Sequence, residues 1–93
     1  MSGRILVVDD LLPNIKLLEA KLSAEYYDVT STRSGLQALK LVEDNSFDII
    51  LLDVMMPEMD GFEVCRRLKS NPQTAAIPVI MVTALSEVQD RIN

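Results

Sequence analysis

Three short runs of hydrophobic residues stand out along the chain, and polar residues follow each of them directly. They occupy residues 5–8, 49–52 and 79–82. Runs this short and rich in β-branched side chains are typical of strands that are buried on both faces of a sheet. A fourth segment, residues 26–32, mixes Tyr and Val with Thr and Ser, and this more polar pattern predicts a strand at the edge of the sheet.

Between these segments, hydrophobic residues recur every three or four positions, which is the spacing of amphipathic helices. Pro13 suits the first position of the first helix, and Asp60 with Glu63 predicts a capping box at the start of the third. Ser86 is a candidate N-cap for a fourth helix. The stripes expected to face the core are Leu11, Ile15, Leu18 and Leu22; Leu36, Leu39 and Val42; and Phe62, Cys65 and Leu68.

The order of predicted elements is β-α-β-α-β-α-β, followed by the beginning of one more helix. Strands that alternate with helices indicate a parallel sheet with right-handed crossovers and helices on its faces. At 93 residues, the chain has the size of a single domain with a modest core. The sequence therefore predicts an α/β fold that spans residues 1–93.

Composition narrows the classes of function. The net charge of −5 argues against binding to the phosphate backbone of nucleic acids, and no hydrophobic run is long enough to span a membrane. A single Cys and the lack of a signal-peptide pattern favour a reduced, cytoplasmic setting. The chain has no His, which excludes catalysis or metal binding by its own histidines.

Polar side chains end three of the predicted strands: Asp9 and Asp10 the first, Asp53 the third and Thr83 the fourth. An acid in such a position is most often a solvated loop residue, and Asp10 is also a candidate cap for the first helix. Three strands that end this way favour a shared crevice at the carboxyl ends of the sheet. Carboxylates held close together repel one another unless a cation intervenes. A set of oxygen ligands without His or Cys suits Mg²⁺.

The chain resembles the receiver domain of two-component response regulators. The resemblance rests on ILVVDD at residues 5–10, DVMMPEMDG at residues 53–61 and IPVIMVTA at residues 77–84, and it covers the whole chain. The sequence of residues 17–27, LLEAKLSAEYY, is most similar to that of the first receiver of PleD-type diguanylate cyclase regulators. The resemblance implies a flavodoxin-like (CheY-like) doubly wound sheet whose four strands have the order 2-1-3-4.

The resemblance also implies roles for the acids. Asp53 is the expected phosphoacceptor, and Thr83 is the hydroxyl expected to contact the phosphoryl group. Mg²⁺ is expected on Asp10, Asp53 and the backbone carbonyl of Met55, with Asp9 acting through water. The implied partner is a histidine kinase or a histidine phosphotransfer protein. The chain itself is not expected to be an enzyme, and the implied output, such as cyclic-di-GMP synthesis, lies outside it.

One departure from the family concerns the C-terminal part. A receiver continues through a fifth strand, which ends in a Lys that contacts the phosphoryl group, and a fifth helix. The chain is therefore expected to be a C-terminally truncated receiver. Lys69 and Arg91 are not expected to replace that Lys, because neither of them follows a strand. Without a neighbour, the strand at residues 79–82 would be an exposed hydrophobic edge. We therefore expect a homo-oligomer that forms through this strand or through an uncovered face of the sheet.

Other functions are weaker alternatives. Phosphotransferases of the haloacid-dehalogenase type need a second Asp two residues after the nucleophile, where this chain has Met55. A dinucleotide-binding domain needs a Gly-rich turn after its first strand, and Asp9 and Asp10 occupy that turn here. An interaction module that keeps the acidic cation site without signalling stays open, and formation of an acyl phosphate distinguishes it from a working receiver.

Overall fold

The computed structural model describes residues 3–82, and they alternate between strands and helices along the whole segment. Thr83 and the helix expected from Ser86 lie outside the described residues. The elements in chain order are β1 (Arg4–Val8), α1 (Leu12–Ala24), β2 (Asp28–Thr32), α2 (Gly35–Asp44), β3 (Ile49–Asp53), α3 (Gly61–Ser70) and β4 (Val79–Val82).

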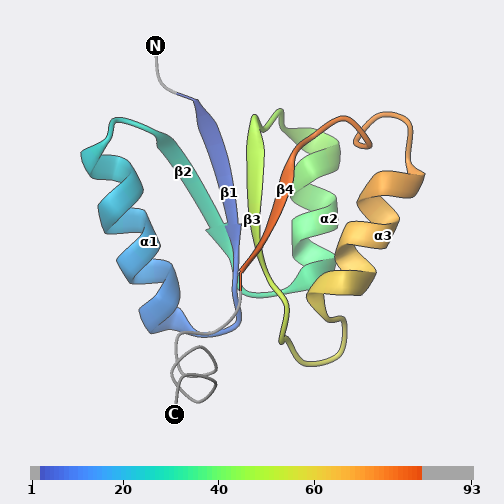
Figure 1. The fold of residues 1–93 in the computed structure, drawn as a ribbon, viewed down its shortest axis with the longest axis horizontal. Coiled ribbons are helices and arrows are strands. Elements are labelled where there is room, and N and C mark those ends of the chain that lie inside the picture. Colours follow the sequence, from blue (N-terminus) through green and yellow to red (C-terminus); the bar gives the residue numbers. More distant parts are fainter. Residues whose placement is uncertain (1–2, 83–93) are drawn as a thin grey trace.

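The four strands form one parallel sheet with the order β2-β1-β3-β4. Helix α1 covers one face of this sheet, and α2 and α3 cover the other (Figure 1). This arrangement confirms the predicted three-layer α/β fold and its strand order. In the register of the sheet, Val8 of β1 lies between Thr32 of β2 and Leu52 of β3. The residues that follow Val8 and Leu52 therefore leave the sheet at the same level.

Side chains of the central strands alternate between two hydrophobic clusters, because successive residues of a strand point to opposite faces. In β1, Leu6 and Val8 face α2 and α3, whereas Ile5 and Val7 face α1. The first cluster holds ten buried residues: Leu6, Val8, Ala38, Val42, Phe47, Ile50, Leu52, Met56, Val64 and Leu68. The second holds three: Ile5, Val7 and Ile15.

Three residues of the predicted stripes are not in the core. Leu11, Leu36 and Phe62 are 49%, 56% and 64% exposed, so these assignments were wrong. Leu11 precedes α1 and has extended backbone angles, and it therefore does not continue the helical stripe. The buried residues are instead Gly35, Ala38 and Val42 in α2 and Gly61, Val64 and Leu68 in α3, so Ala38 and Val64 lie on the core faces. Leu36 and Phe62 each lie two residues earlier, about 200° away around a helix of 3.6 residues per turn.

The helix starts follow the sequence more closely. The side chain of Asp60 accepts a hydrogen bond from the backbone N–H of Glu63 at 2.9 Å, which confirms Asp60 as the N-cap of α3. The Glu63 carboxylate does not complete the capping box, because it accepts hydrogen bonds from Arg66 and Arg67 instead. These two guanidinium groups lower the pKa of Glu63 to about 2. The exposed surface of α3 is therefore an ion-pair network.

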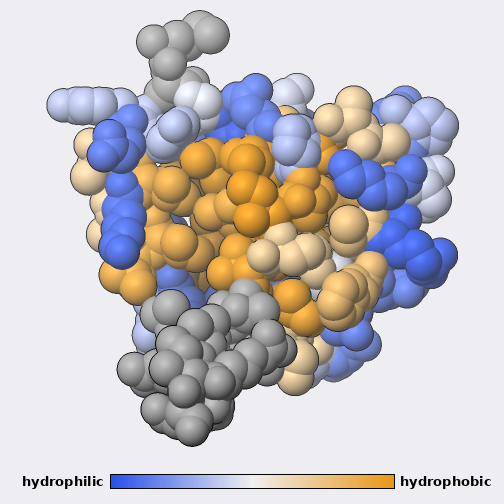
Figure 2. All heavy atoms as spheres, in the orientation of Figure 1, coloured by the Kyte–Doolittle hydropathy of each residue, from blue (hydrophilic) through white to orange (hydrophobic). Residues whose placement is uncertain are grey.

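The two edges of the sheet differ in character. The edge strand β2 is the polar segment that the sequence predicted for this place. At the other edge, β4 consists of Val79, Ile80, Met81 and Val82, and Ile80 is 49% exposed. On the face drawn in Figure 2, hydrophobic residues gather in the middle and hydrophilic residues flank them on both sides. Within the described part of the chain, no helix is long and hydrophobic enough to cross a membrane.

Candidate metal centre

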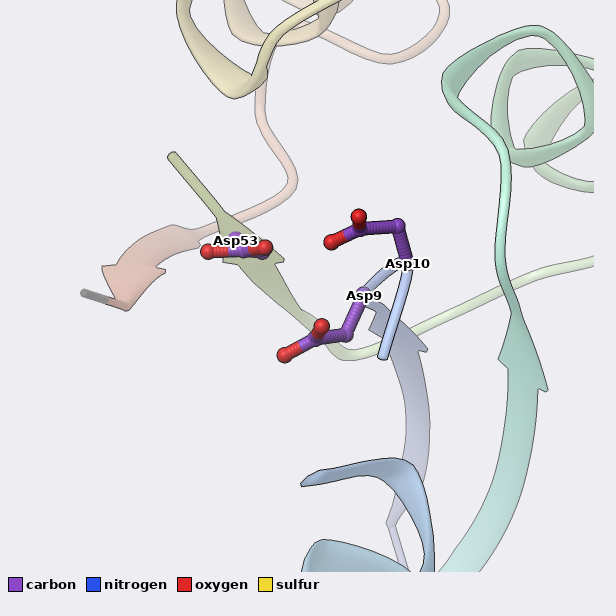
Figure 3. A group of neighbouring side chains, drawn as sticks. All are labelled: Asp9, Asp10 and Asp53. Carbon is purple, nitrogen blue, oxygen red and sulfur yellow. The ribbon is translucent and has the colours of Figure 1, made fainter. Parts of the chain in front are cut away.

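Three carboxylates meet at the carboxyl end of the sheet (Figure 3). Asp9 follows β1, Asp10 lies in the loop between β1 and α1, and Asp53 is the last residue of β3. One carboxylate oxygen of each lies within 4.8 Å of the other two. Asp9 and Asp53 are buried and Asp10 is half-buried. The structure thus brings together the three acids that the sequence placed at the ends of strands, whereas Thr83 lies beyond the described residues.

Asp53 carries the electrostatic consequence of this crowding. Its pKa is raised to about 6, first because burial disfavours a charged carboxylate and second because the negative charge of Asp9 lies nearby. Asp10 raises the pKa further, and a hydrogen bond from the backbone N–H of Met55 to Oδ1, at 3.3 Å, opposes the shift. A divalent cation on the cluster would neutralise this repulsion and lower the pKa of Asp53 again.

Asp9 fastens the start of α1 to the sheet. Its Oδ1 accepts a hydrogen bond from the backbone N–H of Leu11 at 2.9 Å, and its Oδ2 accepts one from the Asn14 side chain at 3.2 Å. Its own N–H donates to the carbonyl of Thr32 in β2. The N-cap residue Leu11 provides no side-chain cap, and Asp9 instead satisfies the backbone N–H of Leu11, one of the orphan donors at the start of the helix. The alternative in which Asp10 caps the first helix is therefore wrong.

Asp10 turns its carboxylate toward Asp53 (Figure 3). Its backbone carbonyl accepts two hydrogen bonds from Arg33, one from Nε at 3.2 Å and one from Nη2 at 2.9 Å. Sequence reasoning missed Arg33, because a charged residue in the loop after an edge strand carries no signal of its own. The contact depends on two loops that lie 23 residues apart in the chain.

The loop after β3 is held by a close approach between backbones. The N–H of Gly61 donates to the carbonyl of Val54 at 3.0 Å. A Cβ at position 61 would collide with the carbonyl oxygen of Asp53, so this approach requires glycine. Glu58 adopts a φ of 67°, a left-handed conformation that costs a non-glycine residue about 1–2 kcal/mol. The start of α3 is therefore fixed against the residue that carries the central carboxylate.

An open hollow of about 410 Å³ lies beside the acids, and its lining includes Asp10, Met55 and Asp60. Met55 is 59% exposed at this hollow, whereas Met56 is buried in the core and Met59 packs against the core. The donor set at this end consists of oxygens alone, because the chain has no His and the only Cys lies in α3. Such a set fits a hard divalent cation such as Mg²⁺ rather than a transition metal.

Comparison with known proteins agrees with this geometry. Residues 5–93 match the family model of the response regulator receiver domain. The chain is 59% identical over 93 residues to the response regulator PleD of Caulobacter vibrioides, a match that covers 100% of this chain and 20% of PleD. It is 44% identical over 86 residues to a probable cyclic di-GMP phosphodiesterase of Vibrio cholerae, covering 92% of this chain and 19% of that protein. The chain thus spans about a fifth of the length of these relatives.

Solved structures show the same fold. A putative response regulator from Chloroflexus aurantiacus superposes with a TM-score of 0.88 at 32% identity, covering 99% of this chain and 75% of that one. The receiver domain of the sensor histidine kinase PA1611 from Pseudomonas aeruginosa superposes with a TM-score of 0.85 at 32% identity, covering 100% of this chain and 76% of that one. In the PA1611 structure, a magnesium ion is coordinated in the active-site cleft.

Proposed function

Because the chain belongs to the response regulator receiver domain family, we propose that its Asp53 accepts a phosphoryl group from a histidine of a partner protein. The observation that carries this proposal is the meeting of the Asp9, Asp10 and Asp53 carboxylates within 4.8 Å beside an open hollow. The partner is a histidine kinase or a histidine phosphotransfer protein, which supplies the histidine that this chain lacks.

The reaction that fits the site is a phosphoryl transfer in which Asp53 is the nucleophile. A carboxylate oxygen of Asp53 forms a bond to phosphorus, the bond between phosphorus and the partner's imidazole nitrogen breaks, and an acyl phosphate results. Asp53 must be ionised for this step, and its raised pKa of about 6 still leaves it mainly ionised at pH 7. Its place at the very end of β3 puts this buried carboxylate at the carboxyl end of the sheet, next to Asp10.

We assign the cation site to Asp10, Asp53 and the backbone carbonyl of Met55, with Mg²⁺ as the cofactor. Bound Mg²⁺ would supply positive charge to the phosphoryl oxygens. Both Asp9 oxygens already accept hydrogen bonds from the start of α1, which supports a role for Asp9 through water rather than as a direct ligand. By resemblance, Thr83 contacts the phosphoryl group and couples it to switching.

The output of the whole protein is a proposal that rests on relatives. The resemblance to PleD-type regulators and the match to a probable cyclic di-GMP phosphodiesterase support an output in cyclic-di-GMP metabolism. Synthesis is the variant that the PleD-type resemblance favours. A relative from Synechocystis, 42% identical over 90 residues, is instead a DNA-binding transcriptional regulator, so the receiver alone does not decide the output. The enzyme that carries out such an output lies outside this chain. We place the receiver domain itself in the cytoplasm.

We also propose that the chain self-associates through the β4 edge. Ile80 exposes a β-branched side chain there, and β4 carries no charged residue that would discourage pairing with another strand. Sedimentation at several concentrations should give a mass that rises with concentration and returns to the monomer mass in the Ile80→Lys variant. A monomer at all concentrations would contradict this proposal.

Incubation with acetyl phosphate and Mg²⁺, followed by intact mass, tests the receiver function. We expect the mass of one phosphoryl group to be added, and the addition to disappear in Asp53→Asn. Asp44→Asn is the matched control, because Asp44 ends α2 at the opposite end of the sheet and should not affect labelling. A chain that binds Mg²⁺ but is never labelled would instead be an interaction module that keeps only the cation site.

A further inference from the structure

The rest of the fold holds the three acids of the cluster to different degrees. Asp9 makes hydrogen bonds through its N–H and both carboxylate oxygens. Asp53 is part of β3, lies opposite Val82 of β4, and accepts a hydrogen bond at Oδ1. Asp10 lies in a loop, and within residues 3–82 its hydrogen bonds are the two that its carbonyl accepts from Arg33. Arg33 is thus the one side chain of this segment that anchors Asp10.

The base of Arg33 is itself fixed. Thr32, directly before it, is buried at the end of β2, and its carbonyl accepts the N–H of Asp9. Ser34, directly after it, is the N-cap of α2 and accepts the N–H of Gln37 at 3.1 Å. From this base the planar guanidinium directs two N–H groups at one oxygen, a geometry that the rigid fork of arginine favours. The contact therefore links the β2–α2 loop to the residue that faces Asp53.

We propose that Arg33 is a positioning residue of the cation site. By holding the backbone carbonyl of Asp10, it keeps the Asp10 carboxylate turned toward Asp53 and so strengthens the binding of a divalent cation. The inference rests on the proposed cation site and adds a residue outside its ligands. A purely electrostatic role would have the opposite sign, because a positive guanidinium near the site repels an approaching cation. Removing Arg33 therefore weakens cation binding if it positions Asp10 and strengthens binding if it acts only by charge.

A Mg²⁺ titration followed by the NMR amide shifts of Asp10 and Asp53 tests the inference. Mutation of residues that hydrogen-bond to metal ligands weakens metal binding by about 10–100-fold. Because Arg33 contacts the backbone of Asp10 and not its carboxylate, we expect a loss at the low end of this range, about tenfold, in Arg33→Met. Arg33→Lys keeps the charge and a donor, and its Mg²⁺ affinity should lie between those of the wild type and Arg33→Met. Lys21→Met is the matched control: it removes the same charge from the last turn of α1, at the opposite end of the sheet, and should bind as the wild type does.

The melting temperature without Mg²⁺ should be the same in Arg33→Met and the wild type, so that the lost affinity reports on the site. In an Asp10→Asn background, Arg33→Met should cause little further loss, because the residue through which Arg33 acts is already altered. Unchanged or tighter binding in Arg33→Met, while the wild type binds Mg²⁺, would overturn the inference and leave the proposed function intact. A wild-type chain without any Mg²⁺-dependent shift would overturn the cation site and this inference together.

Discussion

The two faces of the sheet are covered by unequal amounts of protein. Helices α2 and α3 bury a cluster of ten residues on one face, whereas α1 buries a cluster of three on the other. The acid cluster lies at the end of the sheet, where it contacts helices from both faces. Asp9 is bonded to the start of α1, and Asp53 is in contact with the start of α3 through Gly61. We therefore expect the face covered by α2 and α3, the thick face, to supply most of the stability, and the face covered by α1, the thin face, to depend more on polar contacts at the site.

The largest expected effect is the loss of stability when a core residue is truncated, and its size should differ between the two faces. Leu68 of α3 and Ile15 of α1 are equally buried, each 3% exposed. Truncation of such residues to Ala costs about 2–5 kcal/mol, depending on how far the site can relax. We expect Leu68→Ala to lower the free energy of unfolding by about 4 kcal/mol and Ile15→Ala by about 2 kcal/mol. Urea unfolding measures both, and equal losses would show that the thin face contributes as much as the thick one.

The next effect concerns the contact between α3 and the site. Gly61→Ala forces a methyl group against the Asp53 carbonyl and should cost about 2–3 kcal/mol, as overpacking does. It should also weaken Mg²⁺ binding, because the end of β3 must shift. Gly3→Ala is the matched control, since a Cβ there meets its nearest atom at 3.4 Å, which is an ordinary contact. A Gly61→Ala protein as stable as the Gly3→Ala protein would contradict the close approach.

A smaller effect isolates the charge of the cluster from the packing of either face. The pKa of Asp53 is about 6 in the folded state against 3.8 for a free side chain, so its contribution to stability is present below pH 3.8 and lost as the pH rises through 6. After allowance for solvent screening, Asp53→Asn should be more stable than the wild type at pH 8 without Mg²⁺ by on the order of 1–2 kcal/mol.

Thermal melts across this pH range measure the difference. It should vanish near pH 4, where the wild-type carboxyl is protonated, and shrink when Mg²⁺ is added at pH 8, because only the wild type retains the full set of ligands. If the difference in stability between the wild type and Asp53→Asn is the same at pH 4 and pH 8, neither burial nor the neighbouring acids raise the pKa of Asp53.

The smallest effect tests the polar contacts of the thin face. Asn14→Ala removes the hydrogen bond from α1 to Asp9 and should cost about 1 kcal/mol, because the partially buried Asp9 oxygen loses a donor. Gln73→Ala is a control in the loop between α3 and β4, since its side chain makes none of the hydrogen bonds found within residues 3–82. If both variants unfold at the same urea concentration, the anchoring of α1 through Asp9 contributes nothing measurable.

Sequence reasoning succeeded where a pattern is local. The bounds of β1 and β4 follow from short hydrophobic runs, and the acids at the ends of β1 and β3 meet because the strands are parallel and in register. It failed at the first residue of each predicted stripe in α2 and α3, because hydrophobicity alone favours Leu36 and Phe62. The small residue Gly35 allows α2 to approach α3 closely, and a Cβ there would lie 2.7 Å from Val64. Arg33 was missed because its role arises only when two loops distant in sequence meet.

The proposed phosphorylation of Asp53 is tested most directly by mapping the modified residue. After incubation with acetyl phosphate and Mg²⁺, reduction by borohydride converts an aspartyl phosphate into homoserine, which peptide mass spectrometry locates. We predict homoserine at position 53 alone, in a reaction that requires Mg²⁺. Homoserine at position 9 or 10, or none at any position in a folded chain that binds Mg²⁺, would contradict the assignment of Asp53 as the phosphoacceptor.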